Sequence, residues 1–336
     1  MTKLSQLFKN WHYRKKRAEL SPTNVSGSDL APNKILRPLA HQQWQLVGNL
    51  LEFSETSKMH NQKNAFIEFF YRFSRSFAGV FGFVILATLI VLSLIIPLTT
   101  KDPLIIDVEN RNETFFTNGH ILGTDALGRD LWARLWHGLR YSLTLSVVAT
   151  FIQVIIGLFI GIMMGHFRIF DKLMTFVIKI ISNVPSIIIL ITITIIIKPT
   201  FWVMVFALSF TSWTGIANQM RSQVLRAKSF EWVSASKVLG TPTYKVLLNY
   251  LPVLLPLLIT EIVFHIPGII LSETSLAFIG LSIPNVATLG NLISDGSKNF
   301  TVFPRYVLIP SFMLILVTTS IQLMANSVQD TLLRQR

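Results

Sequence analysis

The stretch GVFGFVILATLIVLSLIIPL, residues 79–98, carries no charge over its whole length. The hydrocarbon core of a bilayer is about 30 Å thick, so a helix of about 20 apolar residues crosses it. The stretch therefore predicts a membrane-spanning helix. The whole chain agrees, because 51% of its 336 residues are hydrophobic and 14% are charged, against about 25% charged in soluble domains.

Five further apolar runs follow this one. They cover residues 142–164, 173–197, 201–216, 246–271 and 306–325. Gly157 and Gly161 allow another helix to approach the second span closely. Pro185 is expected to kink the third span, and three prolines are expected to bend or break the fifth. We therefore expect an all-α membrane protein with six transmembrane helices.

The basic residues indicate how these spans are oriented. Six spans place both termini on one side, and 22 of the 30 Lys and Arg residues fall on that side. The positive-inside rule then puts both termini in the cytoplasm. Before the first span, no apolar run is long enough for a signal peptide.

The segments outside the spans divide the chain further. We expect residues 1–63 to form a polar cytoplasmic tail and residues 64–78 to form an interfacial helix with several Phe on one side. Residues 79–98 are the first transmembrane helix, and residues 99–140 are expected to be extracellular. Residues 141–330 then hold the remaining five transmembrane helices.

Composition and motifs exclude several classes of function. A formal net charge of +13 suggests nucleic-acid binding in a soluble protein, but here the charges cluster between apolar runs and no nucleic-acid-binding motif accompanies them. The chain has no cysteine, hence no disulfide and no thiolate metal site. It also lacks a Walker loop, a nucleophile elbow and a zinc-binding HExxH motif. We expect no catalysis, metal or cofactor in this chain.

A short amphipathic segment, KSFEWVSASKVLG, lies between two apolar runs at residues 228–240. Ser229 is expected to cap a helix, Glu231 lies in its first turn, and Gly240 is expected to end it. Such a helix beside a membrane either lies on lipid or docks into a partner. The predicted orientation puts it in the cytoplasm.

The segment GTDALGRD, at residues 123–130, follows the first span. Its two carboxylates have no ligand spacing suited to a metal ion, which favours a structural turn packed through its glycines. A role in contact with an extracellular binding protein stays open. The residues that define this segment are Gly123, Thr124, Asp125, Gly128, Arg129 and Asp130.

Ionisable residues inside the fifth span are candidates for function, because exposing them to lipid is costly. Glu261 and His265 lie four residues apart and share one helical face. They form either a mutual pair buried between helices or part of a translocation path. Glu273, further along the chain, is assigned to the same possible path.

Five blocks of sequence resemble one known family, in that family's order. They are HILGTDALGRDLWARLWHGLRYSLTL at 120–145, SNVPSIIIL at 182–190, SWTGIANQMRSQVL at 212–225, ETSLAFIGLSIP at 273–284 and LGNLISDG at 289–296. The family is the dipeptide and oligopeptide permease C family of ABC importers, also described as binding-protein-dependent transport system inner membrane components. The resemblance covers residues 64–330 and implies a type I importer permease.

The segment at 228–240 resembles the family's cytoplasmic coupling helix, whose signature has Glu-Ala-Ala, three residues and Gly. The matching positions are Ser234, Ala235, Ser236 and Gly240; Glu231 lies one turn earlier, and Trp232 follows it. The signature glutamate is thus replaced by Ser234. We therefore expect apolar anchoring, through Trp232 and its neighbours, to contribute more to docking than charge does.

The resemblance also implies the chain's partners. They are a second permease subunit, two ABC ATPase subunits that bind ATP and Mg, an extracellular solute-binding protein, a peptide substrate and the lipid of a prokaryotic plasma membrane. Nickel or another small solute is an alternative cargo. A secondary transporter independent of ATP is an alternative of another class, which would predict inverted internal repeats.

Overall fold

The computed structural model describes residues 65–100 and 102–333, so the expected tail at 1–63 lies outside the described residues. The described residues form helices and, apart from two isolated β-bridges, no strand. These are α3 (Ala65–Ser74), α4 (Phe77–Thr99), α5 (Leu131–His166), α6 (Arg168–Ser182), α7 (Ser186–Ile196), α8 (Phe201–Ala227), α9 (Glu231–Val238), α10 (Thr243–Asn249), α11 (Leu251–Phe278), α12 (Leu289–Ser297) and α13 (Arg305–Leu333).

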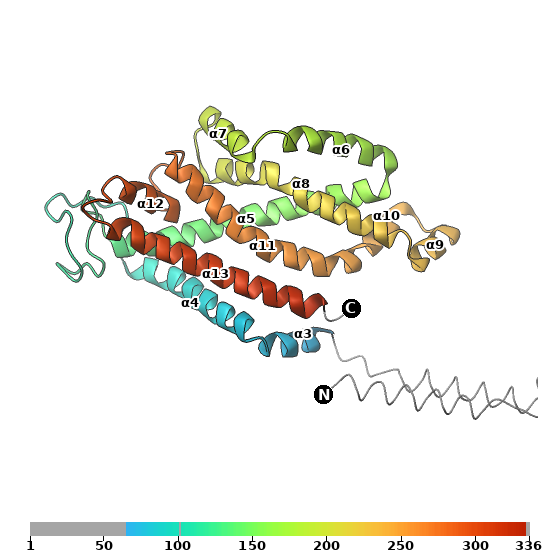
Figure 1. Ribbon diagram of the computed structural model, residues 1–336, viewed down its shortest axis with the longest axis horizontal. Coiled ribbons are helices and arrows are strands. Elements are labelled where there is room, and N and C mark those ends of the chain that lie inside the picture. The colour runs from blue at the N-terminus through green and yellow to red at the C-terminus, as the bar shows by residue number, and fades with distance from the viewer. Residues whose placement is uncertain (1–64, 101, 334–336) are drawn as a thin grey trace, which may run out of the picture. The chain divides into compact units, whose positions relative to one another are not determined.

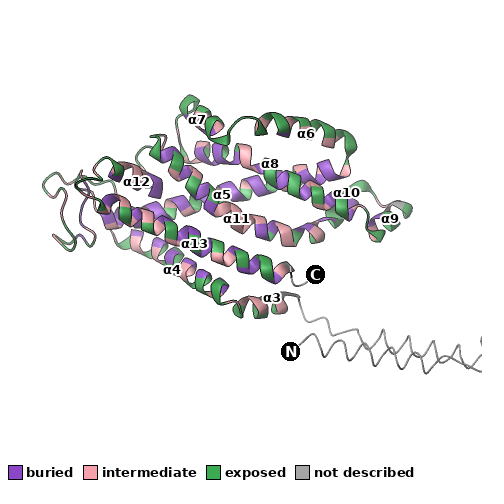
Figure 2. Cartoon of the chain, viewed as in Figure 1, coloured by how far each residue is buried: buried purple, intermediate pink, exposed green. Residues whose placement is uncertain are grey.

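Five described helices are long and apolar enough to cross a membrane: α4, α5, α8, α11 and α13. A sixth crossing is possible if α6 and α7 together form one span. The expected all-α membrane fold is therefore confirmed. Figure 2 shows buried residues on the helix faces turned toward one another and exposed residues on the outer faces, as expected for a bundle surrounded by lipid.

The third span departs most from expectation. Instead of one kinked helix over 173–197, it consists of α6 and α7, whose axes differ by 81°. Pro185, just before α7, has an extended ψ of 128° and lacks a backbone N–H, so the chain leaves the helix there. The expected kink is in fact a break between two helices.

Other helix boundaries also differ from the apolar runs. The expected interfacial helix at 64–78 ends at Ser74, because Ser76 caps the next helix by accepting a hydrogen bond from Gly79 N at 3.2 Å. The helix that holds the second apolar run, α5, starts at Leu131, before the run itself at 142–164. The fifth run, 246–271, is broken next to its first proline, because α10 ends at Asn249 and α11 begins at Leu251, whereas α11 itself continues through Pro256 and Pro267.

Close packing of glycines joins α5 to α8. A Cβ added at Gly157 would lie 2.7 Å from Ile216 Cβ, and one at Gly161 would lie 2.5 Å from Met220 Cβ. These distances are shorter than real Cβ contacts, so only glycine allows the two helices to approach this far. The expected close approach of another helix to the second span is confirmed, and Gly165, against Val224, extends it by one more turn.

The two ends of the bundle differ. In Figure 1, α12 and the segment that links α4 to α5 gather at one end. The opposite end carries α9 and α10, together with α3 and the last turn of α13. We call these the loop end and the α9 end. The helix with the coupling signature thus lies at the same end as the last described residues of the chain.

Candidate functional site

The helix expected at residues 228–240 is present as α9, and its C-terminus forms as the sequence predicts. Gly240 has a φ of +68°, and the N–H of Thr241 donates to Ser236 O at 3.0 Å. This bond and the left-handed glycine are those of a Schellman motif. Pro242 follows and starts α10 at a new angle.

The N-terminus of α9 differs from the prediction. Ser229 does not cap it, because α9 begins at Glu231 and Phe230 lies between them; the Ser229 hydroxyl donates to Arg226 O at 2.7 Å in the preceding helix α8. The first carbonyl acceptor for α9 is Phe230, which receives bonds from Val233 N and Ser234 N at 3.1 and 3.4 Å. The helix therefore begins at Glu231, and the expected cap at Ser229 is wrong.

One side of α9 faces the chain itself. Val233 is fully buried, and Trp232 is half-buried with its ring 5.8 Å from that of Tyr250. Tyr250, at the junction of α10 and α11, is itself completely buried. The Trp232 ring therefore stabilises the attachment of α9 to α11, a position that the sequence alone did not reveal.

The other side of α9 is open. Val238 is 87% exposed and Leu239 is 82% exposed, although both are apolar. Glu231, Ser234 and Ala235 are also exposed. Two aliphatic side chains beside the signature positions therefore form the open apolar part of this helix, and they are the residues available for contact with another protein.

A set of polar contacts ties the base of α9 to α5. Lys228 Nζ donates to the carbonyl oxygen of His166 at 2.7 Å, at the last residue of α5. The Tyr250 hydroxyl lies 3.4 Å from His166 Nδ1. Through these contacts, and through the Trp232 ring on Tyr250, the short helix α9 is attached to both α5 and α11.

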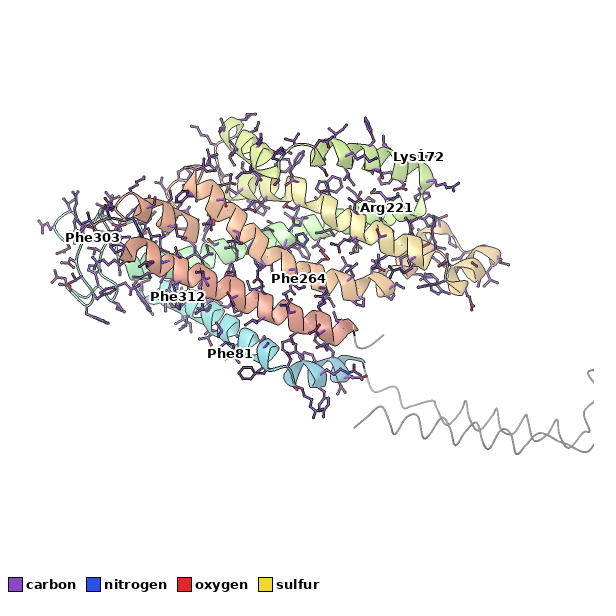
Figure 3. The ribbon with its side chains drawn as sticks, viewed as in Figure 1. Phe81, Lys172, Arg221, Phe264, Phe303 and Phe312 are labelled. Carbon is purple, nitrogen blue, oxygen red and sulfur yellow. The ribbon has the colours of Figure 1, made fainter. Side chains whose placement is uncertain are left out.

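A second attachment at this side of the bundle joins α6 to α8. Arg221 on α8 forms a two-pronged ion pair with Asp171 on α6, with 2.8 Å between Nη2 and Oδ2. Figure 3 labels Arg221 on α8 and Lys172 on the neighbouring α6. A bidentate Arg–carboxylate pair fixes orientation as well as distance.

At the loop end, the segment at residues 123–130 is a tightly bonded turn. Gly123 and Gly128 have φ values of +75° and +82°. A Cβ at Gly128 would lie 1.7 Å from Asp107 O, and one at Gly123 would lie 2.2 Å from Glu113 O. Both positions therefore require glycine for conformation and for space.

The polar residues of this turn form hydrogen bonds with neighbouring segments of the chain. Thr124 is fully buried, and its hydroxyl donates to Asn110 O at 2.5 Å and accepts from Glu113 N at 3.0 Å. Asp130 caps α5 by accepting from Trp132 N at 3.0 Å. The turn is therefore built as a structural unit, as the sequence favoured.

Asp125 is the centre of a charged network that the sequence analysis did not foresee. Its carboxylate accepts from Arg129 Nε at 2.8 Å and from Arg134 Nη1 at 2.6 Å. The same two arginines donate to Asp295 Oδ2, on α12, at 3.0 and 2.9 Å. The network therefore joins the turn, α5 and α12.

Charge balance explains why this network tolerates burial. Arg134 is only 3% exposed, and two carboxylates face the two arginines. Burial opposes ionisation of Asp295, but its hydrogen bonds with Arg134 and Arg129 outweigh this effect and hold its pKa below the ordinary value. Within the described residues, no group of three or more His, Asp or Glu side chains is arranged to hold a metal ion.

The ionisable residues of α11 fall into two separate places. His265 Nε2 lies 3.1 Å from Glu261 Oε2, so the expected pair is formed. Glu273 is not part of it. That carboxylate is 3% exposed and lies 3.4 Å from the Ser142 hydroxyl of α5, which also accepts from Leu289 N at the start of α12. Glu273 therefore belongs to the packing of α5, α11 and α12.

The Glu261–His265 pair borders a hollow in the bundle. A cavity of about 250 Å³ lies between α7, α8 and α11, and His265 lines it together with four hydroxyl side chains and several apolar ones. The hydroxyl residues are Ser186, Thr211, Ser212 and Ser272. Figure 3 labels Phe264, another lining residue, part-way along α11. We call this cavity the hydroxyl groove.

Comparison with known proteins identifies a family and several relatives that resemble this chain. The family model described as "Binding-protein-dependent transport system inner membrane component" matches residues 153–335. The oligopeptide transport system permease protein AmiD of Streptococcus pneumoniae is 39% identical over 162 residues, 48% of this chain and 53% of AmiD. The dipeptide transport system permease protein DppC of Lactococcus lactis subsp. cremoris is 31% identical over 162 residues, 48% of this chain and 47% of DppC.

A third relative extends the match. The oligopeptide transport system permease protein OppC of Haemophilus influenzae is 30% identical over 269 residues, which are 78% of this chain and 86% of OppC. The chain thus spans about half the length of AmiD and of the Lactococcus DppC, and most of the Haemophilus OppC. Together with its membrane-spanning helices, these matches show that the chain belongs to the family of binding-protein-dependent transport system inner membrane components.

Proposed function

We propose that this chain is a transmembrane permease subunit of an ABC importer that moves peptides across a prokaryotic plasma membrane. The relatives are named for oligopeptide and dipeptide transport. The observation that carries the proposal is α9, which exposes an apolar surface while its base is attached to α5 and α11. A helix of this kind can receive a push from a partner and pass it to the spans.

The proposed machine contains more than this chain. Two ABC ATPase subunits, which bind ATP and Mg, dock at the cytoplasmic helices of the two permeases, one of them at α9, and both termini of this chain lie on that side. A second permease subunit completes the path, and an extracellular solute-binding protein delivers the peptide at the loop end. This chain itself catalyses no reaction, and it contacts lipid through the outer faces of its helices.

The proposed mechanism is alternating access by rigid-body movement. ATP-driven closure of the ATPases displaces α9. The contact between Trp232 and Tyr250 passes this displacement to α11, and the contact between Lys228 and His166 passes it to α5. Packed helices of this kind switch between two arrangements rather than deform continuously. Access to the path then changes from one side of the membrane to the other.

Co-purification tests the proposal. The tagged chain, solubilised in mild detergent, should bring down an ABC ATPase and a second permease, and the reconstituted complex should take up peptide in an ATP-dependent way. Gly240→Pro should abolish uptake, because proline cannot adopt the φ of +68° that ends α9. Peptide uptake without any ATPase, or in the Gly240→Pro variant at the normal rate, would contradict the proposal.

A further inference from the structure

Two of the membrane-spanning helices carry a row of polar or glycine residues at helical spacing. On α11 the row is Glu261, His265, Gly268, Ser272 and Ser275, and on α8 it is Thr211, Gly215, Asn218 and Ser222. A Cβ added at Gly215 or Gly268 would meet no atom within 4 Å, so these rows border open space. Polar rows on membrane-spanning helices are costly against lipid and mark a substrate pathway or a protein contact.

The hydroxyl groove lies where the two rows meet. Thr211 and Ser212 line it from α8, while His265 and Ser272 line it from α11. Its volume of about 250 Å³ is below the roughly 300–1,000 Å³ of pockets that enclose a whole drug-sized ligand. The groove therefore suits one end of an extended ligand rather than a complete one.

The hydroxyls of the groove present acceptors. Ser212 Oγ donates its hydrogen to Leu208 O at 3.0 Å, and Ser272 Oγ donates to Gly268 O at 2.9 Å. A hydroxyl has a single hydrogen, so each oxygen that has spent it on the helix offers only its lone pairs. A ligand that bonds to Ser212 and Ser272 must therefore supply the donor.

The pair of Glu261 and His265 beside the groove also bears on which ligand the groove accepts. His265 Nε2 lies 3.1 Å from Glu261 Oε2. When Nε2 of a neutral ring donates this bond, Nδ1 is left as an acceptor. No Lys or Arg lines the groove, and Glu261 supplies a nearby negative charge. The groove therefore favours a cationic group that donates several hydrogen bonds.

We propose that the hydroxyl groove binds the N-terminal end of the transported peptide, through its α-ammonium group and first amide N–H groups. This inference rests on the proposed function and names the part of the substrate that this chain contacts. Ser212, Ser272 and His265 accept the hydrogen bonds, while Glu261 favours the positive charge through His265. Phe264 and its apolar neighbours pack against the first side chain of the peptide.

Cysteine labelling tests this proposal, because the chain contains no native cysteine. Ser272→Cys places one thiol in the groove. Thr192→Cys is the matched control, because the Thr192 hydroxyl also donates to a helix carbonyl, Ile188 O at 2.8 Å, but lies exposed on α7 and does not line the groove. Each variant is reconstituted in nanodiscs as the whole transporter, with ATP and binding protein. Maleimide labelling of this chain is followed without peptide, with trialanine and with N-acetyl-trialanine.

Trialanine should protect Ser272→Cys but not Thr192→Cys, and N-acetyl-trialanine should protect much less. Adding Glu261→Gln to Ser272→Cys should make protection by trialanine roughly tenfold weaker, as when a hydrogen bond linked to a charged group is lost. The proposal is wrong if a transporter that takes up trialanine shows no protection of Ser272→Cys. It is equally wrong if both peptides protect alike and Glu261→Gln has no effect.

The same reconstituted transporter distinguishes failure of the groove proposal from failure of the proposed peptide-import function. Uptake of trialanine with unprotected Ser272→Cys overturns the groove and leaves the importer intact. A complex that assembles with its ATPase but takes up no peptide with any variant or with the unmodified chain overturns the peptide function, and the groove proposal with it.

Discussion

The two ends of this bundle are held together by different forces. At the loop end, two arginines and two aspartates join three segments, and the turn around them requires glycine at two positions. At the α9 end, a short helix is attached through one tryptophan and one lysine while its outer side exposes Val238 and Leu239. A polar group that has all its bonds within the chain stabilises the fold, whereas an exposed apolar residue is available to a partner.

This difference assigns roles to the two signatures. In the segment at 123–130, Gly123 and Gly128 are required by the conformation of the turn and by its close contacts. In and beside α9, Val233 packs against the rest of the chain, whereas Val238 and Leu239 are exposed and contribute little to its stability. Substitutions at the loop end should therefore change stability, and substitutions on the outer side of α9 should change association.

The largest effect is expected for Arg134→Met. It leaves Asp125 and Asp295 with one arginine between them, and removing one partner of a buried ion pair costs about 3–5 kcal/mol. The apparent melting temperature in detergent should fall strongly. Arg111→Met is the control, because Arg111 is exposed in the segment that links α4 to α5 and has no ion pair among the described residues. Equal melting temperatures for the two variants would contradict a structural role for the network.

The next largest effect concerns Val238→Ser combined with Leu239→Ser. Both side chains are exposed, so stability should stay unchanged, while affinity for the ATPase should fall about tenfold or more if they are anchors of the contact. Binding is measured by titrating purified ATPase onto the permease in nanodiscs. Val233→Ser, on the buried side of the same helix, should instead lower the melting temperature. If the double variant bound the ATPase with unchanged affinity, the proposal that the exposed side of α9 contacts the ATPase would be wrong.

A smaller effect is expected from pH at the loop end. The pKa of Asp295 is lowered from its ordinary value of 3.8. A lowered folded pKa means that the carboxylate contributes stability above the ordinary pKa and loses it as pH falls through the folded value. Unfolding measured between neutral pH and about pH 3 should show this loss only at the acid end. The stability of the Asp295→Asn variant should depend less on pH at the acid end. An unchanged pH dependence would show that the Asp295 carboxylate is not the group responsible.

The smallest effect is expected for Ser234→Glu, which restores the family's glutamate. Ser234 is exposed on α9, and an exposed ion pair contributes only about 0–1 kcal/mol. Peptide-stimulated ATP hydrolysis should change little, and it should depend only weakly on salt. A strong loss of coupling in Ser234→Ala, with Trp232→Ala silent, would show that polar contact rather than apolar packing governs this end.

Sequence reasoning predicted well wherever the signal is local. The apolar runs identified the five long membrane-spanning helices, the spacing of Glu261 and His265 placed them on one helical face, where they pair, and Gly240 predicted the end of α9. Each of these depends on residues within one helix or one turn. The same reasoning placed Ser229 as a cap and failed, because α9 begins only at Glu231, two residues after Ser229.

The missed residues share a different property. Arg134 and Asp295 are hydrogen-bonded to each other although 161 positions separate them in the sequence. No local sequence pattern around either residue predicts this contact. Trp232 was expected to face a partner, yet it lies against Tyr250 of its own chain. The roles of all three depend on which helices become neighbours.

The sequence by itself determined the class of this protein: an all-helical membrane protein with a short helix that carries a docking signature at one end. Those features follow from hydropathy and from backbone preferences, which act over a few residues. Only the tertiary structure decided that α6 and α7 meet at 81°, that the loop end is closed by a charged network, and which side of α9 stays open. Long-range packing decides these features, because a side chain's partners depend on residues that the fold brings together from distant parts of the chain.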